Sequence, residues 1–379
     1  MYWMPIYDIL EAAHVDIFLV NSRQLKFVPG RKSDVQDCQW LQQLHAMGLL
    51  RKSFIPEESM RSLRSYMRLR EDHIRSSAAH ILHMQKAMDA MNIKLHNVIS
   101  QIQGVSGLRI VRAILAGERD PATLAALCEG QILRTKRDRV IASLRGNYKS
   151  EHLFALQQAL ELWEIYQQKI SECDQRINAL LTTIAEALPP PSMPASRKRK
   201  TIRHHKPTID QFGDKLMRVT GGIDPTTLPA VTDYSLLKAV AEIGCDMSPW
   251  KDEKHFTSWL RLAPGKHSSG KYTRSRHHTK HTKAGQIFRQ AAQVIGKSKN
   301  LALGAFYRRI RAKAGPKVAN VATARKLAVM YYHMMKNGTA YVETGIQRYE
   351  QQLQERTIKF LEKKARSMGL LLTPMTQPN

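Results

Sequence analysis

A run of apolar residues spaced by threes and fours, between residues 153 and 188, most constrains how this chain folds. Such spacing places the apolar side chains on one stripe of a helix, and that stripe needs a helical partner. Two positions in it are polar, Gln167 and Asp174. A second helical stretch of similar length covers residues 56–103, so we expect residues 56–190 to form a long coiled-coil hairpin, with pairing between subunits as the alternative. The apolar positions are Leu153, Leu156, Leu160, Trp163, Ile170, Ile177, Leu181, Ile184 and Leu188.

Residues 1–55 predict an incomplete α/β unit. Residues 3–13 have a helical pattern, residues 16–22 (DIFLVNS) resemble a half-buried strand, and residues 34–44 return to a helical period. One strand cannot form a sheet by itself. We therefore expect the other strands of this unit to come from elsewhere.

A proline-rich and basic segment follows the predicted hairpin. It reads PPPSMP and then SRKRKTIRHHK, with six Lys or Arg among residues 197–206. Prolines end helices and like charges repel one another, so residues 191–211 are expected to form a linker. Residues 212–342 then predict a small helical C-terminal domain, and residues 343–379 a helix and tail. The predicted fold is mainly α.

The net charge of +27 is concentrated in one part of the chain. Between Lys254 and Val342 there are 19 Lys or Arg and no Asp or Glu. A sustained positive field attracts phosphate backbones and gains free energy from counterion release, which favours nucleic acid over an anionic membrane as the partner. Four scattered cysteines, and the absence of an apolar run of about 18 residues, predict a reduced, cytoplasmic protein without membrane spans.

Two carboxylates stand out in this basic chain. Asp34 and Asp37 are three residues apart and follow Arg31 and Lys32 directly. One interpretation is a helix start, where acids stabilise the positive end of the helix dipole. The other is part of a metal site, because side chains three residues apart share a helix face.

Two serines stand in the most basic part of the chain. Ser268 and Ser269 could attack a phosphodiester if a base or metal takes the proton and cations hold the phosphate. The alternative is a basic loop in which the serines are spacers. Zinc binding by His277, His278 and His281 is disfavoured, since no cysteine or carboxylate is near them to complete the ligands. The cations expected to contact nucleic acid are Arg31, Lys32, Lys266, Lys271, Arg274, Arg276, Lys280 and Lys283.

Several stretches, in the same order along nearly the whole chain, resemble the insertion-sequence transposases of the one-ten family. That resemblance implies a DEDD-type transposase with a RuvC-like (RNase H-like) N-terminal domain and a C-terminal domain that carries a catalytic serine. The implied function is to cut and rejoin DNA strands so that an insertion sequence moves. The stretches are GRKSDVQDCQWL, LHNVIS, LRGNYKSEHLFAL, VTGGIDPTTLPAV, EIGCDMSPWKDEKHFTSWLRLAPG, SSGK and LGAFYRRIRAKAG.

The resemblance also implies roles for particular residues and partners. Asp34 and Asp37 match the last two acids of the DEDD set, which bind a divalent metal ion such as Mg²⁺. Ser269, which precedes Gly270, matches the nucleophilic serine, with Ser268 as the near alternative. Besides DNA, the implied partners are a structured non-coding guide RNA and further copies of the chain, as a dimer or tetramer, in a nucleoid-associated location.

The first departure from the family pattern lies at the N-terminus. The first Asp and the Glu of the DEDD set are expected upstream of Met1, because the pattern E-x-T-G-x-Y-W reaches this chain only as Met1, Tyr2 and Trp3. We therefore expect an N-terminally truncated enzyme with two of the four acids. The alternative is an inactive copy that only binds nucleic acid or oligomerises.

The second departure is LPAVTD, Leu228 to Asp233, in place of a glycine-bearing PGIG hairpin. Glycine amides in such a hairpin hold a backbone phosphate. Ala230 and Asp233 are therefore expected to weaken that contact.

Overall fold

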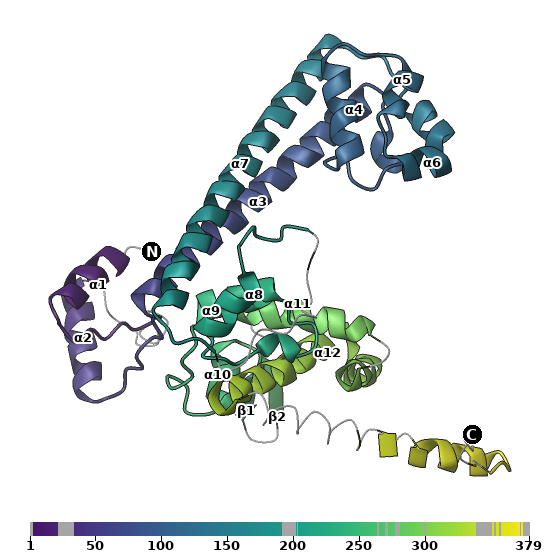
Figure 1. Cartoon of the computed structure of the whole chain (residues 1–379). Coiled ribbons are helices and arrows are strands. Elements are labelled where there is room, and N and C mark those ends of the chain that lie inside the picture. Colours follow the sequence, from purple (N-terminus) through teal and green to yellow (C-terminus); the bar gives the residue numbers. More distant parts are fainter. Residues whose placement is uncertain are drawn as a thin grey trace. The chain divides into compact units, whose positions relative to one another are not determined.

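The computed structural model divides into two compact units, Met1–Glu57 and Glu58–Asn379 (Figure 1). The described part is mainly helical, as expected from the sequence. For the two short strands the backbone alone is described. The described residues are 3–21, 34–191, 202, 204–263, 265–269, 272–276, 281–298, 301–338, 351, 354–355, 358–371 and 373.

The first unit contains α1 (Trp3–Ala12) and α2 (Asp34–Ala46). The strand expected over residues 16–22 is not formed in its described part, where Val20 makes a single β-bridge with Lys52. That prediction is wrong for residues 16–21, because a strand needs a neighbouring ladder and, among the described residues, these pair only with the short segment around Lys52. The RNase H-like nature of this unit stays a prediction.

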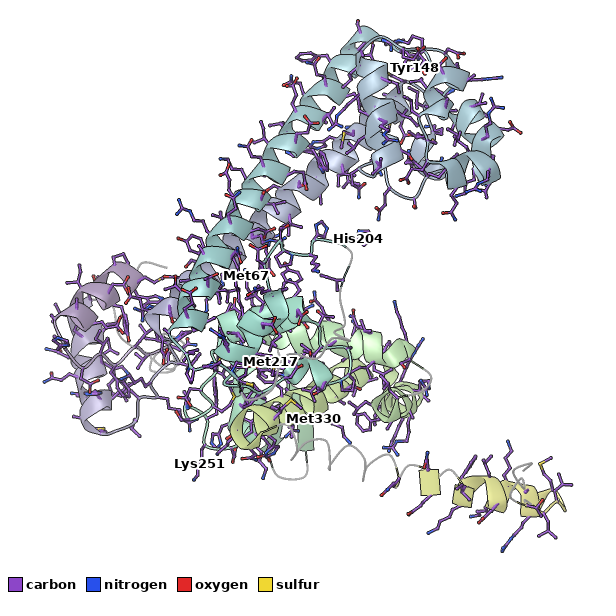
Figure 2. The ribbon with its side chains drawn as sticks, viewed as in Figure 1. Met67, Tyr148, His204, Met217, Lys251 and Met330 are labelled. Atoms are coloured by element: carbon purple, nitrogen blue, oxygen red, sulfur yellow. The ribbon has the colours of Figure 1, made fainter. Side chains whose placement is uncertain are left out.

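In the second unit α3 (Glu58–Ala90) and α7 (Ser150–Glu186) pack side by side along much of their length (Figure 1). We call this helix pair the arm. The polar positions of the apolar stripe are matched across the pair: Gln167 donates from Nε2 to Oγ of Ser77 at 2.7 Å, and Asp174 accepts from Arg70. These two pairs show that the helices run antiparallel. Apolar residues fill the rest of the interface, including Leu63, Met67 (Figure 2), Leu156, Leu160, Ile177 and Leu181.

The helix expected to reach residue 103 ends at Ala90, and Asn92 then adopts a positive φ of 61°. Residues 91–149, which we call the cap, connect the two arm helices. Their elements are η2 (Leu95–Asn97), α4 (Val105–Leu115), α5 (Pro121–Ala126) and α6 (Gly130–Ser143). The apolar residues after Asn92, such as Ile93 and Ile102, are buried in the core of the cap and do not extend the arm.

The remainder of the second unit is a set of helices with one β-hairpin. Its elements are α8 (Phe212–Val219), η3 (Pro225–Thr227), α9 (Asp233–Ile243), α10 (Glu253–Trp259), β1 (Gly265–Ser269), β2 (Tyr272–Arg276), α11 (Lys283–Lys297) and α12 (Ala302–Asn337). An aromatic cluster forms its core. The centre of the Phe256 ring lies 5.1 Å from that of Trp250 and 5.6 Å from that of Tyr332. Tyr332 also donates from its hydroxyl to the carbonyl of Trp250 at 2.9 Å.

Helix α12 is two helices joined at a kink. Gly315 has φ 83° and ψ 170°, a conformation that is essentially restricted to glycine, and Pro316 begins the second half. Proline is favoured in the first turn of a helix, where its missing N–H is not needed. The pair Gly315–Pro316 therefore ends one helix and starts the next.

The base of the arm is attached to α9 by arginines. Arg68 makes a bidentate contact with the carboxylate of Glu242 at 2.9 and 2.8 Å. Arg64 donates to two main-chain carbonyls at the C-terminal end of α9, where the helix dipole favours cations. Arg70 donates to the hydroxyl of Tyr234 at 3.0 Å. These contacts fix the direction in which α3 leaves α9.

Candidate catalytic site and nucleic-acid surface

The two candidate metal ligands lie in the first turn of α2. The helix begins at Asp34, as expected, and both Asp34 and Asp37 are exposed. Their oxygens are the hard donors that Mg²⁺ prefers, and the pair could supply two ligands. Within the described residues no group of three or more His, Cys, Asp or Glu side chains could hold a metal ion. Arg31 and Lys32, predicted to contact nucleic acid, lie outside the described residues.

The candidate nucleophile is at the end of a β-hairpin that the sequence did not predict. Strands β1 and β2 pair antiparallel, with Ser269 opposite Tyr272 and Ser268 opposite Thr273. Gly270 and Lys271 connect them in the sequence and lie outside the described residues, as do His277, His278 and Lys280. The hairpin therefore gives each serine a defined register.

That register separates the two serines. Residues of a strand alternate between the faces of a sheet, and directly opposite residues share a face. His267 is opposite Arg274, and Gly265 is opposite Arg276. Ser269 therefore lies on the same face as Arg274 and Arg276. Ser268 lies on the other face, together with Lys266.

The segments before and after the hairpin are held together by a close contact between the end of α10 and the start of α11. Thr282, the N-cap of α11, donates from Oγ1 to the carbonyl of Leu260 at 3.0 Å and accepts from the amide of Gly285 at 3.0 Å. A Cβ at Gly285 would lie 2.2 Å from the Leu260 carbonyl oxygen. Glycine is therefore required for this approach, which holds the two ends of residues 261–281 together.

Arg289 strengthens this contact from within the core. Its side chain is buried on α11, donates from Nη2 to the carbonyl of Arg261 at 2.9 Å, and lies with Nη1 3.1 Å from Nε2 of His281. Burial lowers the pKa of the Arg289 guanidinium. Arg289 was not predicted as a site residue, although a cation at a buried position of an otherwise apolar helix face is a recognisable signal.

Lys283, one of the predicted nucleic-acid contacts, has an acid partner in the fold. Its Nζ lies 3.8 Å from Glu71 on α3, and the same carboxylate lies 2.7 Å from Nζ of Lys238. The side chain of Lys283 is still about half exposed. A phosphate that approaches Lys283 would compete with Glu71.

A further cationic surface lies on α12. Five of its Lys and Arg side chains within ten residues are exposed, and the surrounding sequence from Lys254 to Val342 contains no acid. Such a surface suits the sequence-independent binding of a phosphate backbone. The five residues are Arg308, Arg309, Arg311, Lys313 and Lys317.

The segment LPAVTD, which departs from the family pattern, joins η3 to α9. Ala230 has a positive φ of 58°, a conformation that favours glycine. Thr232 and Ser235 form a capping box at the start of α9, and Asp233 is buried in its first turn. Ala230 therefore holds a backbone conformation that glycine adopts more readily.

Two protein-family models match separate parts of the sequence. One is described as "Transposase IS116/IS110/IS902 family" and matches residues 226–308, which contain the hairpin with Ser269. The other, a DEDD model of the IS110 type described as "Transposase", matches residues 1–93, which contain Asp34 and Asp37. No curated protein matches the chain.

These two matches define the class of protein as an insertion-sequence transposase. The two matches support an IS110-family transposase, in agreement with the resemblance seen in the sequence. In the described part of the chain, no helix has the length and apolar character needed to cross a membrane.

Proposed function

We propose that this transposase cuts and rejoins DNA strands with Ser269 as its nucleophile. One observation carries the proposal: Ser269 ends β1 on the hairpin face that also holds Arg274 and Arg276, within a segment that has no acid. Cations on the same face as the hydroxyl suit an attack on a phosphodiester, because they can hold the phosphate and stabilise its charge in the transition state, while a base or metal takes the proton.

The proposed reaction has two balanced steps. In the first, Oγ of Ser269 attacks phosphorus and forms a phosphoserine ester, while the bond from phosphorus to one strand oxygen breaks. That oxygen leaves as a hydroxyl with the proton that the serine loses. In the second, a strand hydroxyl attacks the phosphoserine, the strands are joined, and Ser269 regains its proton. No oxidant or nucleotide is consumed, because each broken phosphoester bond is replaced by another.

Asp34 and Asp37 are proposed to bind a divalent ion such as Mg²⁺. When bound, such an ion lowers the pKa of an attacking hydroxyl and stabilises a leaving oxygen. The two acids belong to the first compact unit and Ser269 to the second. The resemblance implies that they meet in an assembled homo-oligomer, a dimer or tetramer, and we propose the same for this chain, on DNA and a structured guide RNA held by the acid-free surface.

The test is cleavage of a supercoiled plasmid that carries the insertion sequence and its flanks, with Mg²⁺ present. Ser269→Ala and Asp34→Asn should each reduce nicking by about 100-fold or more. Ser275→Ala, on the opposite face of the same hairpin, should keep activity within a few-fold. A covalent protein–DNA product, digested and analysed by mass spectrometry, should carry the nucleotide on Ser269.

An adduct on Ser268 would reject the assignment of the nucleophile. If the unmodified chain binds DNA but neither nicks it nor forms an adduct, the alternative of a protein that only binds nucleic acid is correct. Equal cleavage by Asp34→Asn and the parent chain would remove the metal role of α2.

A further inference from the structure

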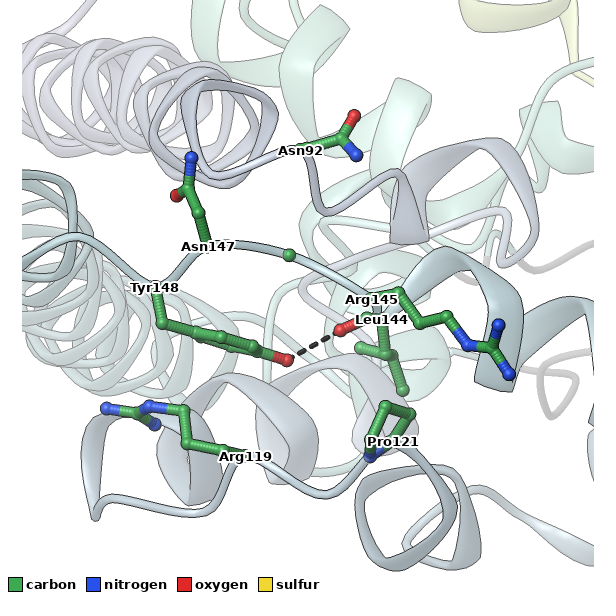
Figure 3. A pocket seen from close by; sticks show the side chains of 8 residues that line it. Asn92, Arg119, Pro121, Leu144, Arg145, Asn147 and Tyr148 are labelled. Atoms are coloured by element: carbon green, nitrogen blue, oxygen red, sulfur yellow. Dashed lines mark hydrogen bonds between the residues drawn. The ribbon is translucent and has the colours of Figure 1, made fainter.

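A cavity of about 520 Å³ lies in the cap, far along the chain from the serine hairpin (Figure 3). It is formed where α3 ends and where α6 connects to α7. Asn92 is the one lining residue that falls within a family-model match; the other lining residues lie in the interval between the two matches. The residues that define it are Asn92, Arg119, Pro121, Arg145, Asn147 and Tyr148.

The walls of this cavity are fixed by the backbone. The amide of Asn147 donates to the carbonyl of Met91 at 3.0 Å, and the amide of Lys94 donates to the carbonyl of Ser143 at 2.9 Å. A Cβ at Gly146 would lie 2.4 Å from the Met91 carbonyl oxygen, so glycine is needed for this close approach. The cavity is therefore part of the folded cap and does not depend on a loose loop.

Arg119 and Tyr148 form one side of the cavity, and hydrogen bonds to main-chain carbonyls hold both side chains. The guanidinium of Arg119 lies 4.8 Å from the centre of the Tyr148 ring, and the Tyr148 hydroxyl donates to the carbonyl of Leu144 at 2.6 Å (Figure 3). Arg119 also donates to the carbonyl of Glu118 at 2.7 Å. Both planar groups are thus held in place before any ligand arrives.

The remaining polar groups suit an anionic ligand with a polar edge. Arg145, Asn92 and Asn147 are exposed at the cavity, and none of the described residues that line it is acidic. An arginine fork recognises phosphate, and carboxamides offer both donors and acceptors to the edge of a base.

The net charge of the whole cap also favours an anionic ligand. Residues 91–149 contain ten Lys or Arg and four Asp or Glu, a balance of 10 − 4 = +6. Two of the four acids are engaged within the fold: Asp120 caps α5 by accepting from Thr123, and Glu118 accepts from the amides that follow it. The cap as a whole is therefore net positive.

We infer that the cap cavity binds an unpaired nucleotide of a nucleic-acid strand. The cavity is open to solvent on one side, and its volume can accommodate a single nucleotide. In this inference Arg145 contacts the phosphate, and the side-chain amides of Asn92 and Asn147 contact the edge of the base. The Arg119–Tyr148 pair contacts the planar face of the base. Because Arg145 and both asparagines are exposed, the strand can continue on either side.

The test uses the full-length chain and labelled single-stranded 12-mers of RNA and of DNA, measured by fluorescence anisotropy. Arg145→Ala combined with Asn92→Gly should weaken single-strand binding by roughly ten-fold. Glycine at residue 92 tolerates the positive φ of 61°, so this variant keeps the turn. The matched control is Arg109→Ala, which removes an exposed arginine of α4 outside the cavity and should cost less than about three-fold.

Ultraviolet crosslinking to the same strands, followed by mass spectrometry, should identify the peptide with Tyr148. Stronger binding of RNA or of DNA tells which strand uses the cavity, and either supports the inference. Equal losses in Arg109→Ala and the double variant, crosslinks only outside the cap, or tighter binding of free mononucleotides than of strands would overturn it.

The cap and the serine hairpin can be tested separately. A Ser269→Ala chain should lose DNA cleavage and keep the cap crosslink. The double variant in the cap should keep its helical circular dichroism spectrum. If its spectrum changes, Asn147→Ala, which keeps the main-chain hydrogen bond to Met91, takes its place with the same expected loss of binding.

Discussion

Arg70 of α3 and Asp174 of α7 form an ion pair near the base of the arm, with side-chain exposures of only 1% and 6%. Arg70 donates to both carboxylate oxygens and to the hydroxyl of Tyr234. Asp174 also accepts from the amide of Thr208 at 3.1 Å. This one pair therefore connects the two arm helices with α9 and with Thr208, near the end of the predicted linker.

Removing one partner of this pair should be strongly destabilising. Arg70→Met leaves a buried carboxylate without its cation and is expected to lower the free energy of unfolding by about 3–5 kcal/mol. The double variant Arg70→Met with Asp174→Leu should recover much of this loss. Arg75→Ala, which removes an exposed partner of Asp72, should change the stability by less than about 0.5 kcal/mol. Urea unfolding of the three variants measures these differences. A double variant as unstable as the single one would contradict the account.

A glycine at residue 230 should stabilise the protein. Ala230 has φ 58°, where an L-residue is strained, so Ala230→Gly should raise the free energy of unfolding by about 0.5–1 kcal/mol. Ala239→Gly, in the interior of α9, should have the opposite effect of about 1 kcal/mol. Thermal denaturation of both variants gives the sign. If the segment from Leu228 to Asp233 also holds phosphate, Ala230→Gly should strengthen DNA binding. The stability prediction fails if both variants lose stability.

Neutralising Glu71 should strengthen nucleic-acid binding. Its carboxylate pairs with Lys238 and Lys283, so Glu71→Gln makes both cations available to phosphates and should tighten binding by about three- to ten-fold at low salt. Asp72→Asn is a matched control, since it removes the same charge one residue away and releases only Arg75. Anisotropy titrations with duplex DNA compare the two. Equal effects would show that net charge alone is responsible.

Acid should destabilise the arm through His80. Burial lowers the pKa of His80, with a further contribution from His83, and among the described residues its Nδ1 is buried without a hydrogen-bond partner. Below pH 6.5 the unfolded chain therefore takes up this proton first, and the free energy of unfolding falls as the pH drops from 7 toward 5. His80→Gln should reduce this fall, whereas His14→Gln, at an exposed position, should not. Melting temperatures at pH 7 and pH 5.5 provide the test.

The helical character of α7 is readable from the sequence because a helix of many turns repeats its apolar spacing. The apolar stripe and its two polar interruptions are visible in the sequence of α7, but their partners Ser77 and Arg70 are not, since neither residue differs in pattern from exposed neighbours on α3. The end of α3 is also hidden. Apolar residues after Asn92 continue a helical spacing while they fill the core of a different substructure, the cap.

The candidate site is predictable only where it depends on local sequence. Asp34 begins α2 as expected from an acid at a helix start. The hairpin of β1 and β2 is not predictable in this way. Strands of five residues with Lys, His, Ser and Arg have little β-propensity, and they form here between segments that are held together by distant residues. Arg289 and Gly285 help to hold those segments together, and their roles depend on contacts with Leu260 and Arg261 that no local pattern encodes.

The matched polar pairs of the arm also set a length. A slip of α7 along α3 would break the Gln167–Ser77 and Arg70–Asp174 contacts together, so the helix from Arg70 to Ala90 works as a spacer that cannot be shortened by sliding. At 1.5 Å per residue that spacer measures about 30 Å, close to nine base pairs of duplex DNA. This spacer is part of α3, and the cap begins where that helix ends.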